Sequence, residues 1–250
     1  MSKYDLFIQP PYMNAAGSLG FAPNSHGPVD LGRLGVFVTN PVSLQARTVA
    51  RGQRFATFQG GFLLHTGYPN PGLSTVIRLY SPRWARSDLP VIVHLLVQDV
   101  GELSGMVERL EVLEGVVGVE LGMPPGVDKN ELGAMMEMAQ GELPVIVRLP
   151  FESAVTLAST AVEAGAAAVS LSPPRGLIAS ETAGITRGRL YGPGLLPQAL
   201  GLVQALAQLD VPVIGAGGIY TERDAAAMLR LGALAVQLDA CLWRGAQVDA

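Results

Sequence analysis

The segment with the clearest chemical potential is a glycine-rich turn near residue 217. The apolar run 211–216 ends in Gly217 and Gly218, and residues 221–224 then have the composition of a helix start. Adjacent glycines let backbone N–H groups approach a phosphate closely, and the dipole of the following helix favours negative charge there. The alternative is a tight turn that needs glycine only for its backbone angles. The turn by itself supports both interpretations equally.

A second group of polar candidates consists of arginines and histidines. Arg175, Arg187 and Arg189 could bind a phosphate or a carboxylate, although solvated loop charges are the more common explanation. His94 lies inside an apolar run, where a histidine is more often a hydrogen-bonded core residue than a catalyst. His65 lies in a loop-like segment and is open to both interpretations. No cluster of metal-ligand residues is visible in the sequence.

These residues require a scaffold, and the chain predicts one of alternating strands and helices. We expect strands at residues 12–16, 36–42, 91–96, 116–122, 145–150, 167–172, 211–217 and 235–240. Helical spacing marks residues 104–113, 153–164, 196–209 and 221–231. About eight strands close a barrel, so we predict an α/β fold of the (β/α)8, or TIM-barrel, type. We expect it to form one domain over residues 1–250.

Two long connections do not fit a minimal barrel. Residues 45–73 and 173–195 hold many of the Gly, Pro and Arg residues. Long loops in a compact domain are usually functional, and in a barrel the loops at the carboxyl ends of the strands surround the active site. The function is therefore expected at these two segments.

Composition excludes several classes of protein. Hydrophobic residues make up 49% of the chain and charged residues 15%, which suits buried strands and disfavours disorder. The apolar runs are far shorter than the roughly 20 residues that span a bilayer, and no signal-peptide pattern opens the chain, so we expect a cytoplasmic protein. A net charge of −4 gives no general attraction to nucleic acid. The single cysteine, Cys241, allows no internal disulfide.

Several segments, in the same order along the chain, resemble the dihydroorotate dehydrogenase family. They are residues 13–20 (MNAAGSLG), 34–44 (LGVFVTNPVSL), 60–72 (GGFLLHTGYPNPG) and 188–197 (GRLYGPGLLP), followed by the turn 217–219 and the strand 235–238. No single segment is specific, but the ordered set covers nearly the whole chain. The resemblance implies an FMN-binding oxidoreductase of pyrimidine biosynthesis, in which hydride passes between a small substrate and the flavin.

The resemblance also implies which residues bind the cofactor. The positions that match backbone contacts to FMN are Ala16, Gly17, Gly192, Gly217 and Gly218. Two lysines of the family pattern are replaced, one by Asn40 and one by Arg148. Arg148 keeps the positive charge at the electron-accepting edge of the flavin, although a planar guanidinium is not equivalent to a compact ammonium.

The substrate pocket implied by the resemblance is altered. Its positions are Leu64, His65, Gly67, Asn70, Gly122 and Ser172. Leu64, Gly122 and, approximately, Ser172 occupy positions where the family has asparagine amides, and these replacements cannot supply the same hydrogen bonds to orotate. The family's Cys or Ser base is also missing, because residues 122–128 read GMPPGVD. No catalytic residue is therefore assigned, and unmodified orotate chemistry is not expected.

The turn after the last strand is a further departure. The family has Gly-Thr where this chain has Asp239 and Ala240. A carboxylate that points into the cofactor pocket would repel a phosphate. Alternatively, the Asp239 side chain points away and forms a helix cap or a salt bridge. The two interpretations have equal weight and decide how well FMN is held.

Three functions follow from these patterns. The first is an FMN-dependent oxidoreductase of the dihydroorotate dehydrogenase type that acts on a small substrate. The second is a diverged barrel that binds another phosphorylated ligand or a protein partner without redox activity. The third is an FMN enzyme with a less polar substrate, its pocket lined by Phe62, Leu64 and Met123. The resemblance further implies a homodimer and, in some relatives, a separate iron–sulfur flavoprotein subunit.

Overall fold

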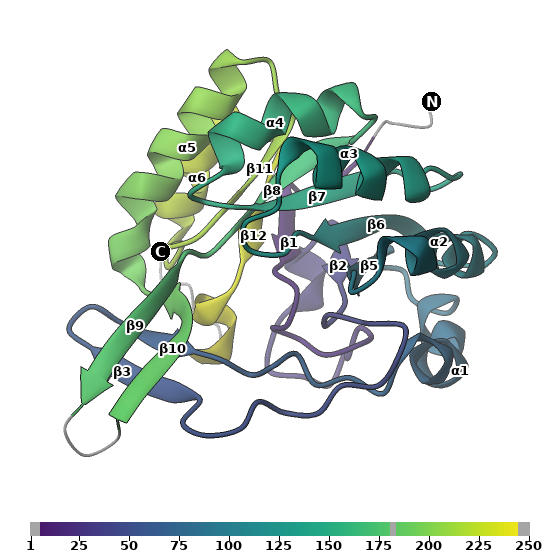
Figure 1. Ribbon diagram of the computed structural model, residues 1–250, viewed down its shortest axis with the longest axis horizontal. Helices are drawn as coiled ribbons and strands as arrows, with labels where there is room; N and C mark the ends of the chain where they lie inside the picture. Colours follow the sequence, from purple (N-terminus) through teal and green to yellow (C-terminus); the bar gives the residue numbers. More distant parts are fainter. Residues whose placement is uncertain (1–5, 181–183, 245–250) are drawn as a thin grey trace.

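The computed structural model describes residues 6–180 and 184–244, and its centre is a ring of parallel strands (Figure 1). The strands are β1 (Tyr12–Asn14), β2 (Phe37–Val38), β5 (Val91–Leu96), β6 (Val116–Gly122), β7 (Val145–Pro150), β8 (Ala168–Ser172), β11 (Val213–Ala216) and β12 (Ala235–Leu238). They form one 8-stranded sheet in the order β1-β12-β11-β8-β7-β6-β5-β2. A parallel bridge between Met13 and Val36 joins the two end strands. The predicted (β/α)8 barrel is therefore confirmed.

Helices cover the outside of this ring. The α-helices are α1 (Leu73–Trp84), α2 (Leu103–Glu111), α3 (Lys129–Met138), α4 (Ala154–Glu163), α5 (Leu196–Gln208) and α6 (Glu222–Arg230). Short 3₁₀ helices are η1 (Leu31–Arg33), η2 (Val100–Glu102), η3 (Pro193–Leu195) and η4 (Ala240–Arg244). Helices α1 and α3 were not among the predicted ones. Across the described ranges, none of the helices has both the length and the apolar character needed to cross a bilayer.

Several predicted strands were too long, and prolines and glycines explain the difference. The segment predicted at 36–42 pairs regularly only over β2, because Pro41 has no N–H to donate. The segment predicted at 211–217 begins as β11 only after Pro212 and ends before Gly217, whose φ is +99°. These strands therefore end where the loops of the barrel mouth begin.

The two long connections are not loops but form a second sheet, which corrects their assignment from the sequence. Strands β3 (Phe55–Phe58) and β4 (Gly61–Leu64) lie in the first connection, and β9 (Arg175–Ser180) and β10 (Gly184–Tyr191) in the second. Together they form an antiparallel sheet in the order β3-β4-β10-β9. Because the connections follow β2 and β8, this sheet lies at the carboxyl ends of the barrel strands, at the lower left of Figure 1.

Side chains that point into the barrel form an apolar layer and a polar layer. The apolar cluster contains Met13, Val36, Val38, Ile92, Ile146, Ala168, Ile214 and Ala235. Alternate residues of a strand face the same side. The inward positions two residues after Ile92, Ile146, Ala168 and Ala235 are therefore His94, Arg148, Ser170 and Gln237. The polar layer is thus the one nearer the second sheet.

Candidate functional site

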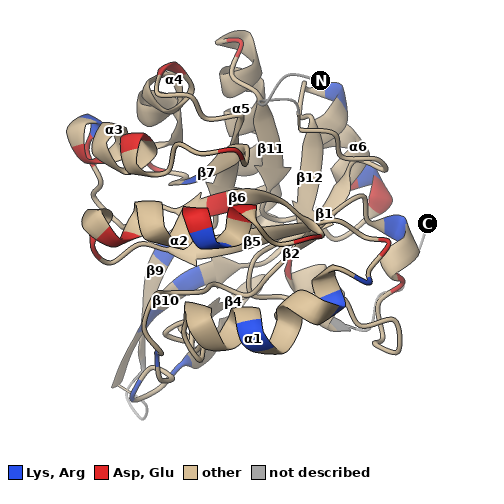
Figure 2. Cartoon of the chain, turned by 90° about the vertical axis from the view of Figure 1, so that its right-hand side faces the viewer, with Lys and Arg blue, Asp and Glu red and all other residues tan. Residues whose placement is uncertain are grey.

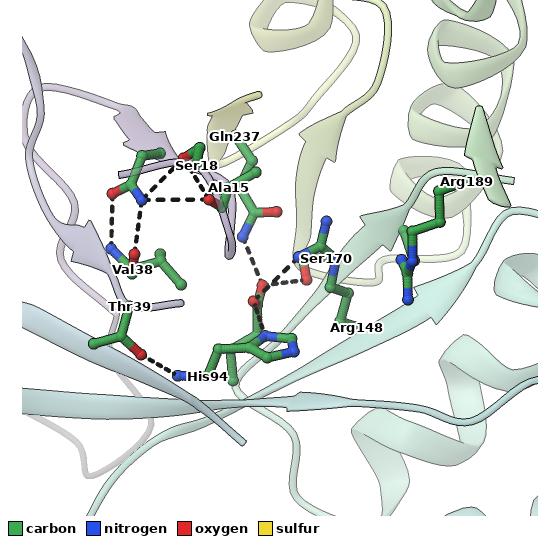
Figure 3. Close-up of polar contacts among 12 residues, drawn as sticks. Ala15, Ser18, Val38, Thr39, His94, Arg148, Ser170, Arg189 and Gln237 are labelled. Carbon is green, nitrogen blue, oxygen red and sulfur yellow. Dashed lines mark hydrogen bonds and ion pairs between the residues drawn. The ribbon is translucent and has the colours of Figure 1, made fainter. Parts of the chain in front are cut away.

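Glu120 on β6 is the centre of the polar layer and is fully buried. Its Oε2 accepts a hydrogen bond from His94 Nδ1 at 2.6 Å. Its Oε1 accepts from the Ser170 hydroxyl at 2.7 Å and from the Gln237 amide at 2.6 Å. Figure 3 shows these side chains converging from different strands. Both carboxylate oxygens are therefore used within the protein, as expected for a structural partner inside the barrel.

The surroundings of Glu120 and His94 determine their protonation states. Burial alone would raise the pKa of Glu120, but the hydrogen bond from His94 and the charge of Arg148 lower this pKa to about 2. Burial lowers the pKa of His94, so its ring is neutral at pH 7 and donates its Nδ1 proton. His94 is 3% exposed. The prediction that His94 is a hydrogen-bonded core residue is confirmed.

Arg148 joins this network to the space above it. Its Nη1 lies 3.8 Å from Glu120 Oε2, which is an ion-pair distance but a long one. Its Nε is buried and has no hydrogen-bond partner, although the residue is only 6% exposed. A buried N–H group of a cation is costly to leave unpaired. Arg148 also lines the cavity above this network, where its positive charge would favour an anionic ligand.

A cavity of about 210 Å³ lies between the polar layer and the second sheet. One wall is formed by the small residues 15–18 and another by the loop 64–68. The cations that line it are Arg47, Arg148, Arg175 and Arg189. Asp239, Tyr191 and Trp243 complete the lining. Small residues on one side and guanidinium groups on the other suit a flat ligand with negatively charged groups.

Arg175 and Arg189 lie directly opposite each other in the pairing of β9 with β10. The guanidinium of Arg189 donates to the Ser172 hydroxyl and lies 5.3 Å from the centre of the Tyr68 ring. Tyr68 itself has a φ of +54°, which is uncommon for a residue with a large side chain. The loop 64–68 is therefore held in a special conformation against Arg189.

Four of the nine predicted cofactor positions line this cavity, and the others make different contacts. Ala16, Gly17, Arg148 and Asp239 line it. The side chain of Asn40 instead accepts a hydrogen bond from Gly20 N at 3.1 Å. Asn40 therefore fixes the loop that follows β1.

The predicted glycines fit closely against their neighbours. A Cβ on Gly192 would lie 2.3 Å from the Gly60 carbonyl oxygen, and one on Gly218 would lie 2.3 Å from the Leu196 nitrogen. Gly217 and Gly218 both have positive φ, of +99° and +75°. Glycine is favoured at both positions because residues with a side chain rarely adopt such φ values.

The carboxylate of Asp239 faces the cavity rather than solvent and is 7% exposed. It accepts a hydrogen bond from the N–H of Ala240, the other predicted residue of this turn. Burial raises the pKa of Asp239 from 3.8 to about 6. A carboxylate at this position is therefore costly in its charged form.

The predicted substrate positions separate into two groups. Leu64, His65 and Gly67 line the cavity, and Ser172 accepts from Arg189 beside it. Asn70 is instead buried in the loop, where its Oδ1 accepts from Gly72 N at 3.0 Å and its Nδ2 donates to Ser43 Oγ at 3.0 Å.

The absence of a side chain at Gly122 has a structural reason. A Cβ at this position would lie 2.7 Å from His94 Nε2. The imidazole thus occupies the space that a side chain at residue 122 would need. Sequence reasoning treated the two residues separately. In the pairing of β5 with β6, His94 lies opposite Glu120, and Gly122 is two residues further along β6.

A larger cavity of about 430 Å³ lies elsewhere, between η1 and α6 on the outside of the barrel. Its lining is mostly apolar and includes Val29, Leu34 and Ile219. The cation in its lining, Arg33, is half-exposed and pairs with Glu222. Among the described residues, no group of His, Cys, Asp and Glu side chains is arranged to hold a metal ion.

Comparison with known proteins places this geometry in a family. The family model for dihydroorotate dehydrogenase matches residues 4–249. The chain belongs to the dihydroorotate dehydrogenase family. The catalytic subunit of dihydroorotate dehydrogenase B (NAD(+)) from Desulforudis audaxviator is 31% identical over 252 residues, covering 92% of this chain and 82% of that protein. Dihydroorotate dehydrogenase A (fumarate) from Lacticaseibacillus paracasei is 32% identical over 254 residues, covering 90% and 86%.

Dihydroorotate dehydrogenases are FMN-dependent oxidoreductases of pyrimidine biosynthesis, so the resemblance seen in the sequence is confirmed at the level of the family. Sequence reasoning missed several residues that line the cavity, namely Arg47, Tyr68, Tyr191 and Trp243. They come from the second sheet, its loops and η4. The Gly67-Tyr68 pair, which precedes a proline, was the available signal for a specially shaped loop.

Proposed function

We propose that this chain is an FMN-binding oxidoreductase that acts on a small substrate other than dihydroorotate. The observation that carries the proposal is a cavity that is lined by the small residues 15–18 on one side and by the buried cation Arg148 on another. Family membership supplies the expectation of a flavin, and this geometry fits one. Ala16 and Gly17 leave room for a flat ring, because only Pro41 Cδ, at 3.8 Å, lies near a Cβ placed on Gly17.

Each residue would have a separate task toward the cofactor. When bound, FMN supplies the group that accepts a hydride from the substrate. Arg148 would stabilise negative charge at the ring, and the N–H groups of Gly217 and Gly218 would face the phosphate. The lid formed by β4 and β10 would exclude water from the substrate side. Glu120 and His94 hold Arg148 in place from below.

The exclusion of dihydroorotate rests on what lines the cavity. Within the described residues, no asparagine and no cysteine is part of that lining. Gly122 has no room for an amide because His94 fills the space. A site that recognises orotate needs donors and acceptors that these residues do not supply. The cavity is therefore expected to bind a small substrate other than dihydroorotate.

The first test is the visible absorption of the purified protein, followed by titration with FMN and measurement of flavin fluorescence. We expect FMN bound at one site per chain and no reduction of the flavin by dihydroorotate. A colourless protein that does not bind added FMN contradicts the cofactor assignment, whereas rapid reduction by dihydroorotate contradicts the substrate assignment. An Arg148→Gln variant is expected to bind FMN at least tenfold more weakly.

A second candidate function, a barrel that binds a ligand without redox activity, is favoured by Asp239 alone. Its buried carboxylate at the turn after β12 opposes a phosphate at that position. A barrel that has lost the reaction and keeps only a ligand site would show this feature. The same titration separates the candidates, because the Asp239→Asn variant would then acquire FMN binding that the natural chain lacks.

A further inference from the structure

The two segments above the barrel mouth carry more arginines than carboxylates. The segments 45–73 and 173–195 together hold six arginines and one acidic residue, in a chain whose formal net charge is −4. The described strands of the second sheet contain three of these arginines and no Asp or Glu. In Figure 2, blue segments recur around β9 and β10, whereas red segments lie on α2, α3 and α4. The two segments that carry the second sheet thus have a net positive charge in a chain whose net charge is negative.

Two of these arginines are placed where like charges repel. Residues directly opposite in an antiparallel pair have Cβ atoms about 4.5–5.5 Å apart, and like charges there are destabilising. Arg175 and Arg189 are such a pair. Arg189 is also close enough to Arg148 for the two charges to interact. Figure 3 shows Arg148 between the Gln237 side of the network and Arg189.

The surroundings of Arg189 offer little compensation. Burial and the charges of Arg148 and Arg175 lower its pKa, and the opposing contributions come from Tyr68 and Tyr191 rather than from a carboxylate. Its side-chain contacts are a serine hydroxyl and an aromatic face. Arg189 is partly buried and its contacts are neutral groups, so a ligand with the opposite charge would offset the cost of its desolvation.

We propose that Arg148, Arg175 and Arg189 form a subsite for a small dianion, with the Ser172 hydroxyl beside it. Planar guanidinium groups bind carboxylate and phosphate oxygens in pairs. Three of them around one space match a group with two negative charges, as in a dicarboxylate or a phosphate monoester, better than a single carboxylate. The lid arginines outside the cavity would draw such an anion toward the mouth.

This inference rests on the proposed function only in taking the dianion to be part of the substrate. The binding itself needs no flavin and no turnover. Isothermal titration and thermal unfolding of the full chain, at constant ionic strength, would compare succinate, inorganic phosphate and acetate. We expect at least tenfold tighter binding of a dianion than of acetate. Preference for succinate assigns a dicarboxylate, and preference for phosphate assigns a phosphate ester.

Matched variants give the controls. Arg189→Gln is expected to weaken dianion binding at least tenfold, and Arg189→Lys to weaken it less, because the charge remains while the planar fork is lost. Arg187→Gln removes the same charge from an exposed position on the same strand and is expected to leave binding unchanged. Circular dichroism would verify that each variant is folded.

Three results would overturn the proposal. Equal binding of acetate and both dianions would show that the site does not recognise two charges. An equal loss in Arg187→Gln and Arg189→Gln would show general attraction by the lid. Loss of phosphate and succinate binding when FMN is added would show that the arginines hold the cofactor instead. A chain that fails to bind FMN but binds dianions refutes the proposed function and keeps this subsite.

Discussion

The polar layer inside the barrel and the arginine cluster at its mouth differ in how their charged side chains are paired. Glu120 is completely buried, yet His94, Ser170 and Gln237 satisfy both of its oxygens. Arg175 and Arg189 lie directly opposite each other on β9 and β10, where burial and the charges of Arg148 and Arg175 lower the pKa of Arg189. A satisfied buried network stabilises a fold, whereas unpaired charge at an opening has to be explained by something that binds there.

Arg148 belongs to both regions, and this makes the comparison informative. One end of its guanidinium lies 3.8 Å from the Glu120 carboxylate, and the residue also lines the cavity. The network below Arg148 thus fixes a cation that borders the ligand space. Substitutions below the arginine should cost stability, and substitutions above it should cost ligand binding.

The largest effect is expected for Glu120→Gln. Removing one charge from a buried, hydrogen-bonded network leaves Arg148 without its counterion and typically costs about 3–5 kcal/mol. Chemical denaturation would measure the free energy of unfolding. Ser170→Ala is the control, since it removes one hydrogen bond worth about 1 kcal/mol. A loss below 1 kcal/mol for Glu120→Gln would mean that the network does not support the barrel.

Asp239→Asn tests a buried carboxylate that lines the cavity. The pKa of Asp239 is raised from 3.8 in the unfolded chain to about 6 in the folded one, so ionisation favours unfolding as the pH rises through this window. The variant should therefore be more stable than the natural chain above pH 6, by up to roughly 3 kcal/mol, and equal to it near pH 3.

Denaturation at several pH values would follow this difference. A gain that is the same at all pH values would show that charge is not its cause. Titration with FMN at pH 7 would show in parallel whether the natural carboxylate also weakens binding of the cofactor phosphate.

Gly122→Ala tests the packing of His94 against the next strand. The added Cβ would lie 2.7 Å from His94 Nε2, and overpacking of this kind costs about 1–3 kcal/mol. Gly105→Ala in α2 is the matched control, because nothing lies within 4 Å of its added Cβ. That helical position should gain up to about 1 kcal/mol. Equal effects at the two sites would refute the idea that His94 excludes a side chain at residue 122.

The barrel could be predicted from the sequence because its strands are apolar runs with breaks that are visible at the residue level. Residues 91–96 and 145–150 were predicted with the bounds that the structure gives to β5 and β7. The second sheet could not be predicted in the same way. Its strands are only half-buried, contain glycines, and pair across more than a hundred residues, as β4 does with β10.

The site was predictable in part, for a related reason. Family resemblance brought Arg148, Leu64 and Asp239 to attention, and all three line the cavity. It did not indicate that the Asn70 amide is hydrogen-bonded to Ser43 and Gly72 instead of facing the cavity. Nor did it show that Arg175 faces Arg189, which depends on the register of a hairpin. Side-chain partners follow from three-dimensional pairing, which a motif does not contain.

The smallest effect on stability is expected where the effect on ligand binding is largest. Arg189→Gln removes repulsion from Arg175 but also removes the contacts with Ser172 and Tyr68. Cross-strand pairs contribute about 0.2–1 kcal/mol, so the two changes nearly cancel and the free energy of unfolding should shift by less than about 1 kcal/mol. Denaturation without added dianion would measure it. A loss as large as that of Glu120→Gln would place Arg189 in the structural network, and the division between a paired interior and an unpaired mouth would then be wrong.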